Sequence, residues 1–208
     1  MRFKSREEAA KQLAVALQKY KGASDSIVVA LPRGGVPLGA VLARELELPL
    51  DIFFVKKIPS PYNEEVAVGA VSENGLLYLN QKAITMLGIS QEYIHNKTKE
   101  ILKKMHEKRA LYQKPSFDYK NKTILLVDDG IATGASFILA IKALKALGAK
   151  RVIAIAPVAP SDVAQELEEI ANEVVIIRKD PYFMAVGAYY DDFHQLSDSE
   201  VQEILKQF

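Results

Sequence analysis

The chain has 208 residues, of which 49% are hydrophobic and 25% are charged, so it can bury one substantial core with a small appendage. A formal net charge of +1 gives no reason to expect nucleic acid or an anionic membrane as a partner. The absence of cysteine excludes disulfides and thiolate metal sites, and three scattered histidines argue against a zinc site.

The first predicted element is an amphipathic helix. Ala9, Leu13 and Leu17 recur at helical spacing, and Gly22 ends the pattern. This segment has no apolar core of signal-peptide length, and no stretch of the chain reaches the roughly 18 apolar residues that a membrane helix needs. We therefore expect a cytoplasmic protein with no membrane partner.

Strands and helices then alternate along the chain. The predicted strands are residues 27–31, 50–55, 124–127, 152–156 and 174–177, and the predicted helices are residues 37–47, 133–147, 162–171 and 198–208. This β-α-β order predicts one α/β domain over residues 1–208, with a doubly wound, mainly parallel central sheet and helices on both faces.

Two segments interrupt the alternation. Residues 66–79 have an alternating pattern across Asn74-Gly75, which predicts a β-hairpin. Residues 91–112 form a long charged helix with a thin apolar stripe, so this helix needs a partner surface. A lid, a dimer contact and a plain surface helix all stay open.

The stretch ILLVDDGIATGAS, residues 124–136, joins a buried strand to a helix through an acidic loop of small residues. Asp128 and Asp129 emerge at the carboxyl edge of the sheet, where α/β proteins bind ligands. The residues after them offer N–H groups, hydroxyls and a helix dipole to a phosphate. These residues are Gly130, Ile131, Ala132, Thr133, Gly134, Ala135 and Ser136. This acidic loop, residues 128–136, predicts a sugar-phosphate site, although a solvated acidic turn before an ordinary helix is the simpler alternative.

A second loop of small residues follows strand 27–31. Pro32, Arg33, Gly34 and Gly35 lead into a helix that begins near Pro37. The glycines permit unusual backbone angles, and the guanidinium can meet phosphate oxygens in a bidentate fork. Alone, a Gly-Gly turn commonly just closes a loop. Beside the acidic loop, this arginine loop, residues 32–35, predicts a diphosphate site next to a 5′-phosphate site.

Further candidates follow in two places. Lys56 and Lys57 end strand 50–55 at the same edge, either as solvated strand ends or as cations that face a ligand. Near the C-terminus, aromatic and acidic residues are dense, and they either pack the last helix or bind a flat ring. The stacking candidates are Phe183, Tyr189 and Tyr190, and the candidate acceptors for ring N–H groups are Asp191 and Asp192.

The acidic loop resembles the phosphoribosyl-pyrophosphate (PRPP) motif of type I phosphoribosyltransferases. The stretches LPRGGVP, VDDGIATGA and AVGxxYxDF are similar to those of a bacterial and archaeal group of predicted phosphoribosyltransferases. The resemblance implies that Asp128 and Asp129 bind the ribose hydroxyls and that residues 130–136 bind the 5′-phosphate. It also implies that the arginine loop binds pyrophosphate, through a strained non-proline cis peptide near Arg33 and Gly34, with help from Lys56 and Lys57.

The same resemblance implies a reaction. A nitrogenous acceptor receives the phosphoribosyl group of PRPP, and pyrophosphate leaves; Asp128, Asp129 and Arg33 are the expected catalytic residues. Mg²⁺ is the implied cofactor, held mainly by the ligand and water, with Asp128 and Asp129 as candidate protein ligands. The implied accessories are a flexible hairpin lid at 58–80, a small hood at 180–208 that recognises the acceptor, and a homodimeric assembly.

One residue narrows the acceptor, and two other functions stay open. Ala132 stands where enzymes for hypoxanthine and guanine usually have an aspartate, which argues against a 6-oxopurine acceptor. A PRPP- or nucleotide-binding regulator on the same fold would keep the phosphate loop without transfer. A hydrolase or phosphorylase-like enzyme would act on a phosphoribosyl compound without a base.

Overall fold

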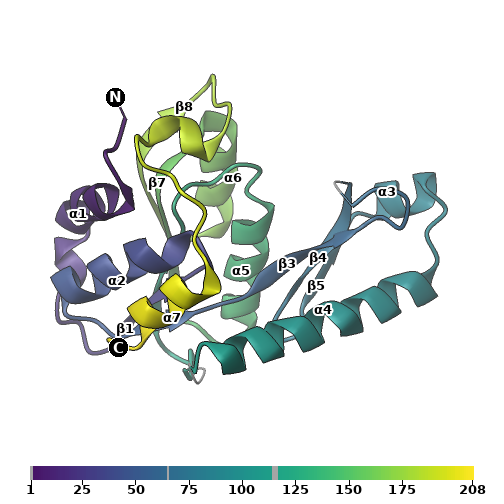
Figure 1. Ribbon diagram of the computed structural model, residues 1–208, viewed down its shortest axis with the longest axis horizontal. Helices are drawn as coiled ribbons and strands as arrows, with labels where there is room; N and C mark the ends of the chain where they lie inside the picture. The colour runs from purple at the N-terminus through teal and green to yellow at the C-terminus, as the bar shows by residue number, and fades with distance from the viewer. Residues whose placement is uncertain (1, 65, 114–116) are drawn as a thin grey trace.

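A five-stranded parallel sheet forms the centre of the protein (Figure 1). The computed structural model describes residues 2–64, 66–113 and 117–208. The strand order is β2-β1-β6-β7-β8, and the bounds are β1 Ser26–Ala30, β2 Leu50–Ile52, β6 Thr123–Val127, β7 Arg151–Pro160 and β8 Glu173–Asp180. Every residue of β1 and β6 is buried, as expected for central parallel strands covered on both faces.

Helices cover both faces of this sheet, which confirms the predicted α/β fold. The helices of one face are α1 Arg6–Ala16, α2 Gly35–Leu46 and α7 Asp198–Leu205, and those of the other are α5 Ala135–Ala146 and α6 Ser161–Ile170. Leu13, Leu42 and Val201 pack in the first core, and Phe137 and Leu167 in the second. Two short 3₁₀ helices, η1 Gln18–Tyr20 and η2 Val186–Tyr189, complete this part.

The prediction of a single strand over residues 50–55 was wrong. The central sheet ends at Ile52, and β3, Val55–Pro59, begins a separate sheet. Phe53 packs in the second core and Phe54 in the first. The N–H of Phe53 donates to the carbonyl of Ala30 in β1 at 3.0 Å, whereas the carbonyl of Phe54 accepts from the N–H of Glu73 at 2.9 Å, so the chain passes from the central sheet to the separate one between them.

The separate sheet projects away from the central one (Figure 1). It pairs β3 with the predicted hairpin, β4 Ala67–Ser72 and β5 Leu77–Leu79, in antiparallel order. An unpredicted short helix, α3 Gln81–Met86, precedes α4, Gln91–Leu111. We call these elements, residues 55–111, the side unit. The predicted lid at 58–80 lies mostly within it, except that residue 65 is outside the described residues, and its mobility stays a prediction.

The long charged helix α4 finds its partner surface within the chain. Ile94, Ile101 and Met105 join Ile58 and Val68 in the first core, so α4 covers the side unit's sheet. Near its end, the guanidinium of Arg109 ties the side unit to β2. None of the helices in the described ranges is long and apolar enough to span a membrane.

Candidate functional site

The arginine loop and the acidic loop meet at one edge of the central sheet. Their strands are neighbours, with Ala30 paired to Val127, and the N–H of Leu31 donates to the carbonyl of Val127 at 3.0 Å. A Cβ on Gly35 would lie 2.6 Å from that same carbonyl oxygen, and one on Gly34 would collide with the Asp129 carboxylate. Glycine at both positions therefore lets the two loops lie in contact. The Pro32–Arg33 peptide bond is cis.

The two carboxylates of the acidic loop perturb each other. The N–H of Asp129 donates to Oδ1 of Asp128 at 2.8 Å. Burial, and then the neighbouring Asp129, raise the pKa of Asp128 well above its ordinary value. Asp128 is only partly buried and keeps some contact with solvent. The desolvation therefore comes from the protein atoms around its carboxylate, although they do not enclose it completely. Burial also raises the pKa of Asp129, while Arg6 opposes that change.

Arg6 is a charged residue at this site that we did not predict. Its Nε donates to Oδ2 of Asp129 at 2.8 Å, and Nη1 donates to the carbonyl of His194 at 3.0 Å. The guanidinium also lies 4.1 Å from the ring centre of Phe193. Both partners of the ion pair are buried, at 8% exposure each. Nothing in the local sequence of α1 distinguishes Arg6, because its partner lies 123 residues away.

The second half of the acidic loop is built to begin a helix. Gly134 has a left-handed φ of 73°, and a Cβ there would lie 2.7 Å from Val163. Helix α5 begins at the next residue, so the N–H groups of its first turn have no partner within the helix. Thr133 and Ser136 are exposed at this turn. By contrast, the Ile131 side chain is buried and its N–H donates to Val158 at 2.9 Å.

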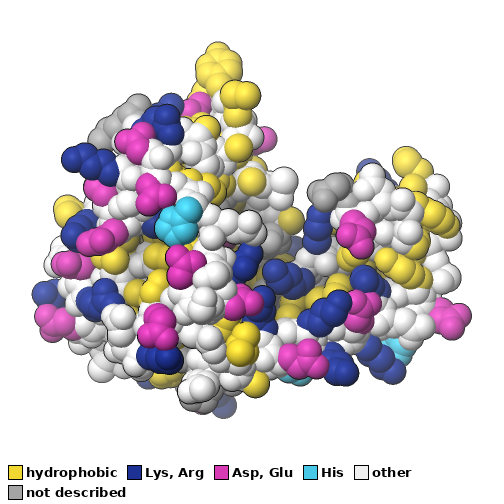
Figure 2. All heavy atoms as spheres, viewed as in Figure 1, with side chains coloured by type: hydrophobic (Ala, Val, Ile, Leu, Met, Phe, Trp, Pro, Cys, Tyr) yellow, Lys and Arg dark blue, Asp and Glu magenta, His cyan; other side chains and the backbone are white. Residues whose placement is uncertain are grey.

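The cations predicted to face a diphosphate lie on different elements. Arg33 Nη1 is 3.8 Å from Oδ1 of Asp198, at the start of α7. The expectation that Lys56 and Lys57 close a strand of the central sheet was wrong, because both lie inside β3 of the side unit. Desolvation, followed by the like charges of Lys108 and Arg33, lowers the pKa of Lys56. The charge of Arg33 therefore acts on Lys56 although the two residues lie on different elements. Figure 2 shows Lys and Arg side chains along the hollow between the main body of the protein and the side unit.

The aromatic residues near the C-terminus mostly contact one another. Tyr190 is 1% exposed, its ring stacks on Phe193 at 5.1 Å, and its hydroxyl donates to the carbonyl of Asp129 at 2.6 Å. Phe183 stacks on Tyr189 at 5.4 Å.

The two neighbouring acids have basic partners. Asp191 pairs with Arg2 at 3.1 Å, and Asp192 lies 3.1 Å from Nδ1 of His194. An acceptor role for Phe183, Tyr189, Tyr190, Asp191 and Asp192 stays a prediction, and for Tyr190 it would require the packed rings to move.

The arginine loop, the acidic loop, Arg6 and residues 193–196 enclose a cleft of about 290 Å³ at the edge of the sheet. Its lining residues are Arg6, Pro32, Arg33, Gly34, Asp128, Asp129, Phe193, His194, Gln195 and Leu196. Among the described residues, no group of three or more His, Cys, Asp or Glu side chains is placed to hold a metal ion. Asp128 and Asp129 supply carboxylate oxygens, so a hard divalent cation there would need further oxygens from a ligand or water.

The sequence is similar to those of two named proteins. Two Mycobacterium tuberculosis proteins, from strains CDC 1551 and H37Rv and provisionally named phosphoribosyl transferases, are each 32% identical over 205 residues. The matched region covers 98% of this chain and 46% of each relative, so the chain spans about half the length of the curated relatives it matches.

Solved structures share the fold. The crystal structure of TT1426 from Thermus thermophilus has a TM-score of 0.84 and 36% identity, covering 100% of this chain and 99% of that one. A purine phosphoribosyltransferase from Pyrococcus horikoshii Ot3, at 16% identity and a TM-score of 0.50, covers 92% of both chains and shows the fold alone.

Residues 3–192 match the phosphoribosyl transferase domain, which accounts for most of the chain. The two contacting loops, the acidic pair and the cis peptide all lie within the matched residues. The chain therefore belongs to the phosphoribosyl transferase domain family.

Proposed function

We propose that the protein transfers the phosphoribosyl group of PRPP to a nitrogenous acceptor and releases pyrophosphate. The observation that carries this proposal is the direct contact between the arginine loop and the acidic loop. One loop offers a guanidinium for a diphosphate, and the other offers carboxylates and a helix start for a ribose 5-phosphate. Their contact supports sites for both ends of PRPP at one edge of the sheet.

The proposed mechanism is electrostatic positioning. A nitrogen of the acceptor attacks C1 of the ribose, and the bond from C1 to the diphosphate oxygen breaks with its electron pair on the diphosphate. Arg33 stabilises the charge on the leaving group, and Lys56 adds to the positive field from β3. Asp128 and Asp129 hold the ribose hydroxyls next to the positive charge that develops on the sugar. Arg6 orients the Asp129 carboxylate and is a positioning residue.

Mg²⁺ is the cofactor that we propose for this reaction. We expect Asp128 and Asp129 to be its protein contacts, with most of its ligands coming from PRPP and water. When bound, it would neutralise diphosphate oxygens and so make pyrophosphate a better leaving group.

We further propose that the acceptor is not a 6-oxopurine. Ala132 is exposed at the turn of the acidic loop, and its methyl group cannot exchange a proton with a ring nitrogen. The hood at 180–208, the lid at 58–80, a homodimeric assembly and a cytoplasmic location are further proposals, supported by the family resemblance.

The first experiment measures PRPP binding by thermal shift. PRPP with Mg²⁺ is expected to raise the Tm of the wild-type protein. Asp129→Ala is expected to abolish the shift, because it removes a carboxylate that binds the ribose hydroxyls. Asp129→Asn keeps the size of the side chain and should weaken the shift in the same way. Asp25→Ala, at the opposite edge of the sheet, is the matched control. An unchanged shift in both Asp129 variants would contradict the ribose assignment.

The second part of the test identifies the acceptor class. The wild-type protein is mixed with PRPP, Mg²⁺ and a panel of nucleobases and amines, and released pyrophosphate is measured. Turnover with one class, and none with hypoxanthine or guanine, is expected. PRPP binding without turnover for any acceptor or water would instead support a regulatory protein on this fold.

A further inference from the structure

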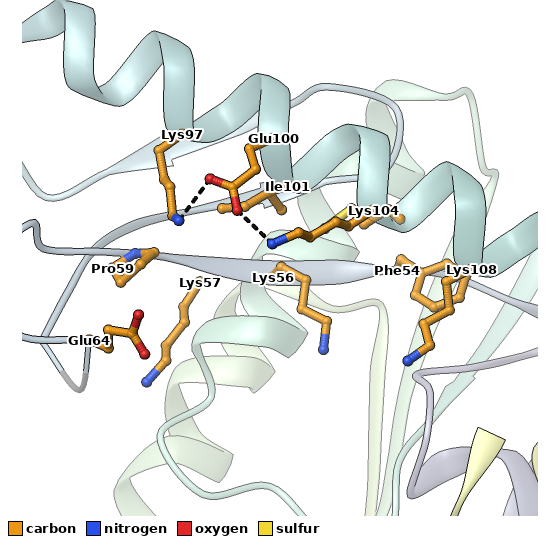
Figure 3. A pocket seen from close by; sticks show the side chains of 11 residues that line it. Phe54, Lys56, Lys57, Pro59, Glu64, Lys97, Glu100, Ile101, Lys104 and Lys108 are labelled. Atoms are coloured by element: carbon orange, nitrogen blue, oxygen red, sulfur yellow. Dashed lines mark hydrogen bonds and ion pairs between the residues drawn. The ribbon is translucent and has the colours of Figure 1, made fainter.

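A second concave surface lies between β3 and α4, outside the cleft formed by the two loops (Figure 3). This groove encloses about 370 Å³. Among the described residues that line it, the charged ones are Lys56, Lys57, Lys97, Lys104, Lys108, Glu64 and Glu100. Lysine outnumbers glutamate there, whereas the whole chain is nearly neutral at +1.

The positive charge is concentrated at the end of the groove nearest the arginine loop. At the other end, Lys97 at 2.9 Å and Lys104 at 2.5 Å share the single negative charge of Glu100. Lys56 and Lys108, by contrast, extend in the same direction past β3 (Figure 3). Desolvation, and then the like charges of Lys108 and Arg33, lower the pKa of Lys56.

A carboxylate of the protein occupies the position between these cations. Asp198 lies 3.0 Å from Lys108 Nζ and 3.8 Å from Arg33 Nη1, and it accepts a hydrogen bond from Tyr112 at 2.8 Å. One internal anion therefore contacts both the arginine loop and α4. The cations of the groove and of the predicted diphosphate site form one continuous surface.

We propose that the groove binds an anion with a linear chain of phosphoryl groups, which begins at Arg33 and Lys108 and continues along β3 past Lys56. The lysines of α4 extend from residue 97 to residue 108, about 16 Å at the rise of an α-helix, which is longer than a diphosphate needs. The same chemistry occurs in inorganic polyphosphate and in nucleoside triphosphates. This site goes beyond the proposed transfer reaction, because binding there requires neither Asp128 and Asp129 nor an acceptor.

Solvation of an edge strand is the simpler explanation for lysines on β3, because charged residues there prevent pairing with other chains. That explanation does not extend to Lys108, which lies on a helix and shares its carboxylate with Arg33. A lysine with a solvation role on the same helix is Lys103, which is 79% exposed and 3.9 Å from Glu107. The two lysines therefore form a matched pair for a test.

The test measures binding of inorganic tripolyphosphate by calorimetry at fixed ionic strength. Lys108→Gln is expected to weaken binding by about fivefold to tenfold, as for loss of one charged hydrogen bond. Lys103→Gln should change it by less than about twofold, since exposed charges contribute little. Asp198→Asn removes the internal competitor and keeps an acceptor for Tyr112, so it should tighten binding by a few-fold. A gain of affinity cannot come from misfolding.

Two further measurements distinguish a nucleotide ligand from an inorganic one, and the groove proposal from the proposed transfer reaction. Adenosine triphosphate that binds more tightly than tripolyphosphate, with the same Lys108 dependence, would identify a nucleotide site; equal affinities would identify an inorganic chain. Asp129→Ala should keep tripolyphosphate binding although it loses the Tm shift with PRPP. The groove proposal can therefore hold even if the proposed transfer reaction is wrong. Equal losses in Lys108→Gln and Lys103→Gln, or no binding of either probe, would overturn the groove assignment.

Discussion

At the scale of single residues, the fold makes the ionised form of Asp128 and Asp129 less favourable than it would be in water. Two adjacent carboxylates lie in a cleft where burial raises the pKa of both, and the charge of Arg6, which hydrogen-bonds to Asp129, opposes the change at each. A ligand that offers hydroxyls or a cation would relieve this repulsion. Binding sites often retain such unfavourable groups because their function requires them.

The acidic pair predicts how stability depends on pH. Because the pKa of Asp128 is raised in the folded chain, ionisation destabilises the fold as pH rises above the ordinary value of 3.8 and through the raised value. Asp128→Asn should therefore increase the free energy of unfolding at pH 8, by on the order of 1 kcal/mol. The gain should vanish near pH 4. Urea unfolding at both pH values measures it.

The control for this prediction is Asp25→Asn, a carboxylate at the opposite edge of the sheet that pairs with Lys150 at 3.7 Å. It should show no such gain at pH 8. If Asp128→Asn gave the same stability difference at pH 4 and pH 8, charge repulsion would not be its cause.

At the scale of elements, a buried ion network joins the side unit to the central sheet. Arg109 at the end of α4 lies 3.2 Å from Asp51 of β2 and 2.6 Å from Glu73 at the β4–β5 turn. Tyr119 also donates to Asp51, at 2.5 Å, and the Asp51 side chain has no solvent exposure. The network fixes where α4, and with it Lys108, lies relative to the arginine loop.

Removal of Arg109 should therefore be costly. Arg109→Met would leave Asp51 buried without its cation, so we expect a loss of about 3–5 kcal/mol in the free energy of unfolding. Arg151→Met, which breaks a half-buried pair of 3.7 Å with Glu173, should lose less than about 1 kcal/mol, because Glu173 keeps its ion pair with Lys19. Denaturant unfolding measures both. The double variant Arg109→Met with Asp51→Asn should recover part of the loss. Equal losses in Arg109→Met and in the control Arg151→Met would show that the network does not anchor α4.

The sequence predicted the loops better than it predicted the path of the chain between them. The acidic and arginine loops could be recognised because a phosphate site at a parallel strand end needs glycines and a helix start that are adjacent in sequence. The break between Phe53 and Phe54 could not, because it depends on hydrogen bonds to Ala30 and Glu73, which are distant in sequence. The Arg6 partnership was missed for the same reason, since its contacts are set by tertiary packing and not by local pattern.

At the scale of the whole molecule, two segments distant in sequence, residues 3–6 and 189–194, converge on the acidic loop. Phe3 pairs with Tyr190 as a parallel bridge, and its N–H donates to the carbonyl of Tyr189 at 2.8 Å. Arg6 contacts the carboxylate of Asp129, and Tyr190 contacts its carbonyl. One residue of the proposed ribose site is thus held by the N-terminal and the C-terminal segments together.

This convergence predicts that a ligand at Asp129 stabilises both segments. With PRPP and Mg²⁺ at about a hundred times Kd, amide exchange in residues 2–10 and 186–194 should slow by about tenfold or more. Opening either segment would release a group that holds Asp129, the residue proposed to bind the ligand. Hydrogen exchange with mass spectrometry measures this, and residues 161–170 of α6 should not change. In Arg6→Ala the added protection of residues 2–10 should shrink while that of 128–136 persists. Protection confined to 128–136 in the wild-type protein would mean that the two segments pack on the site without being coupled to it.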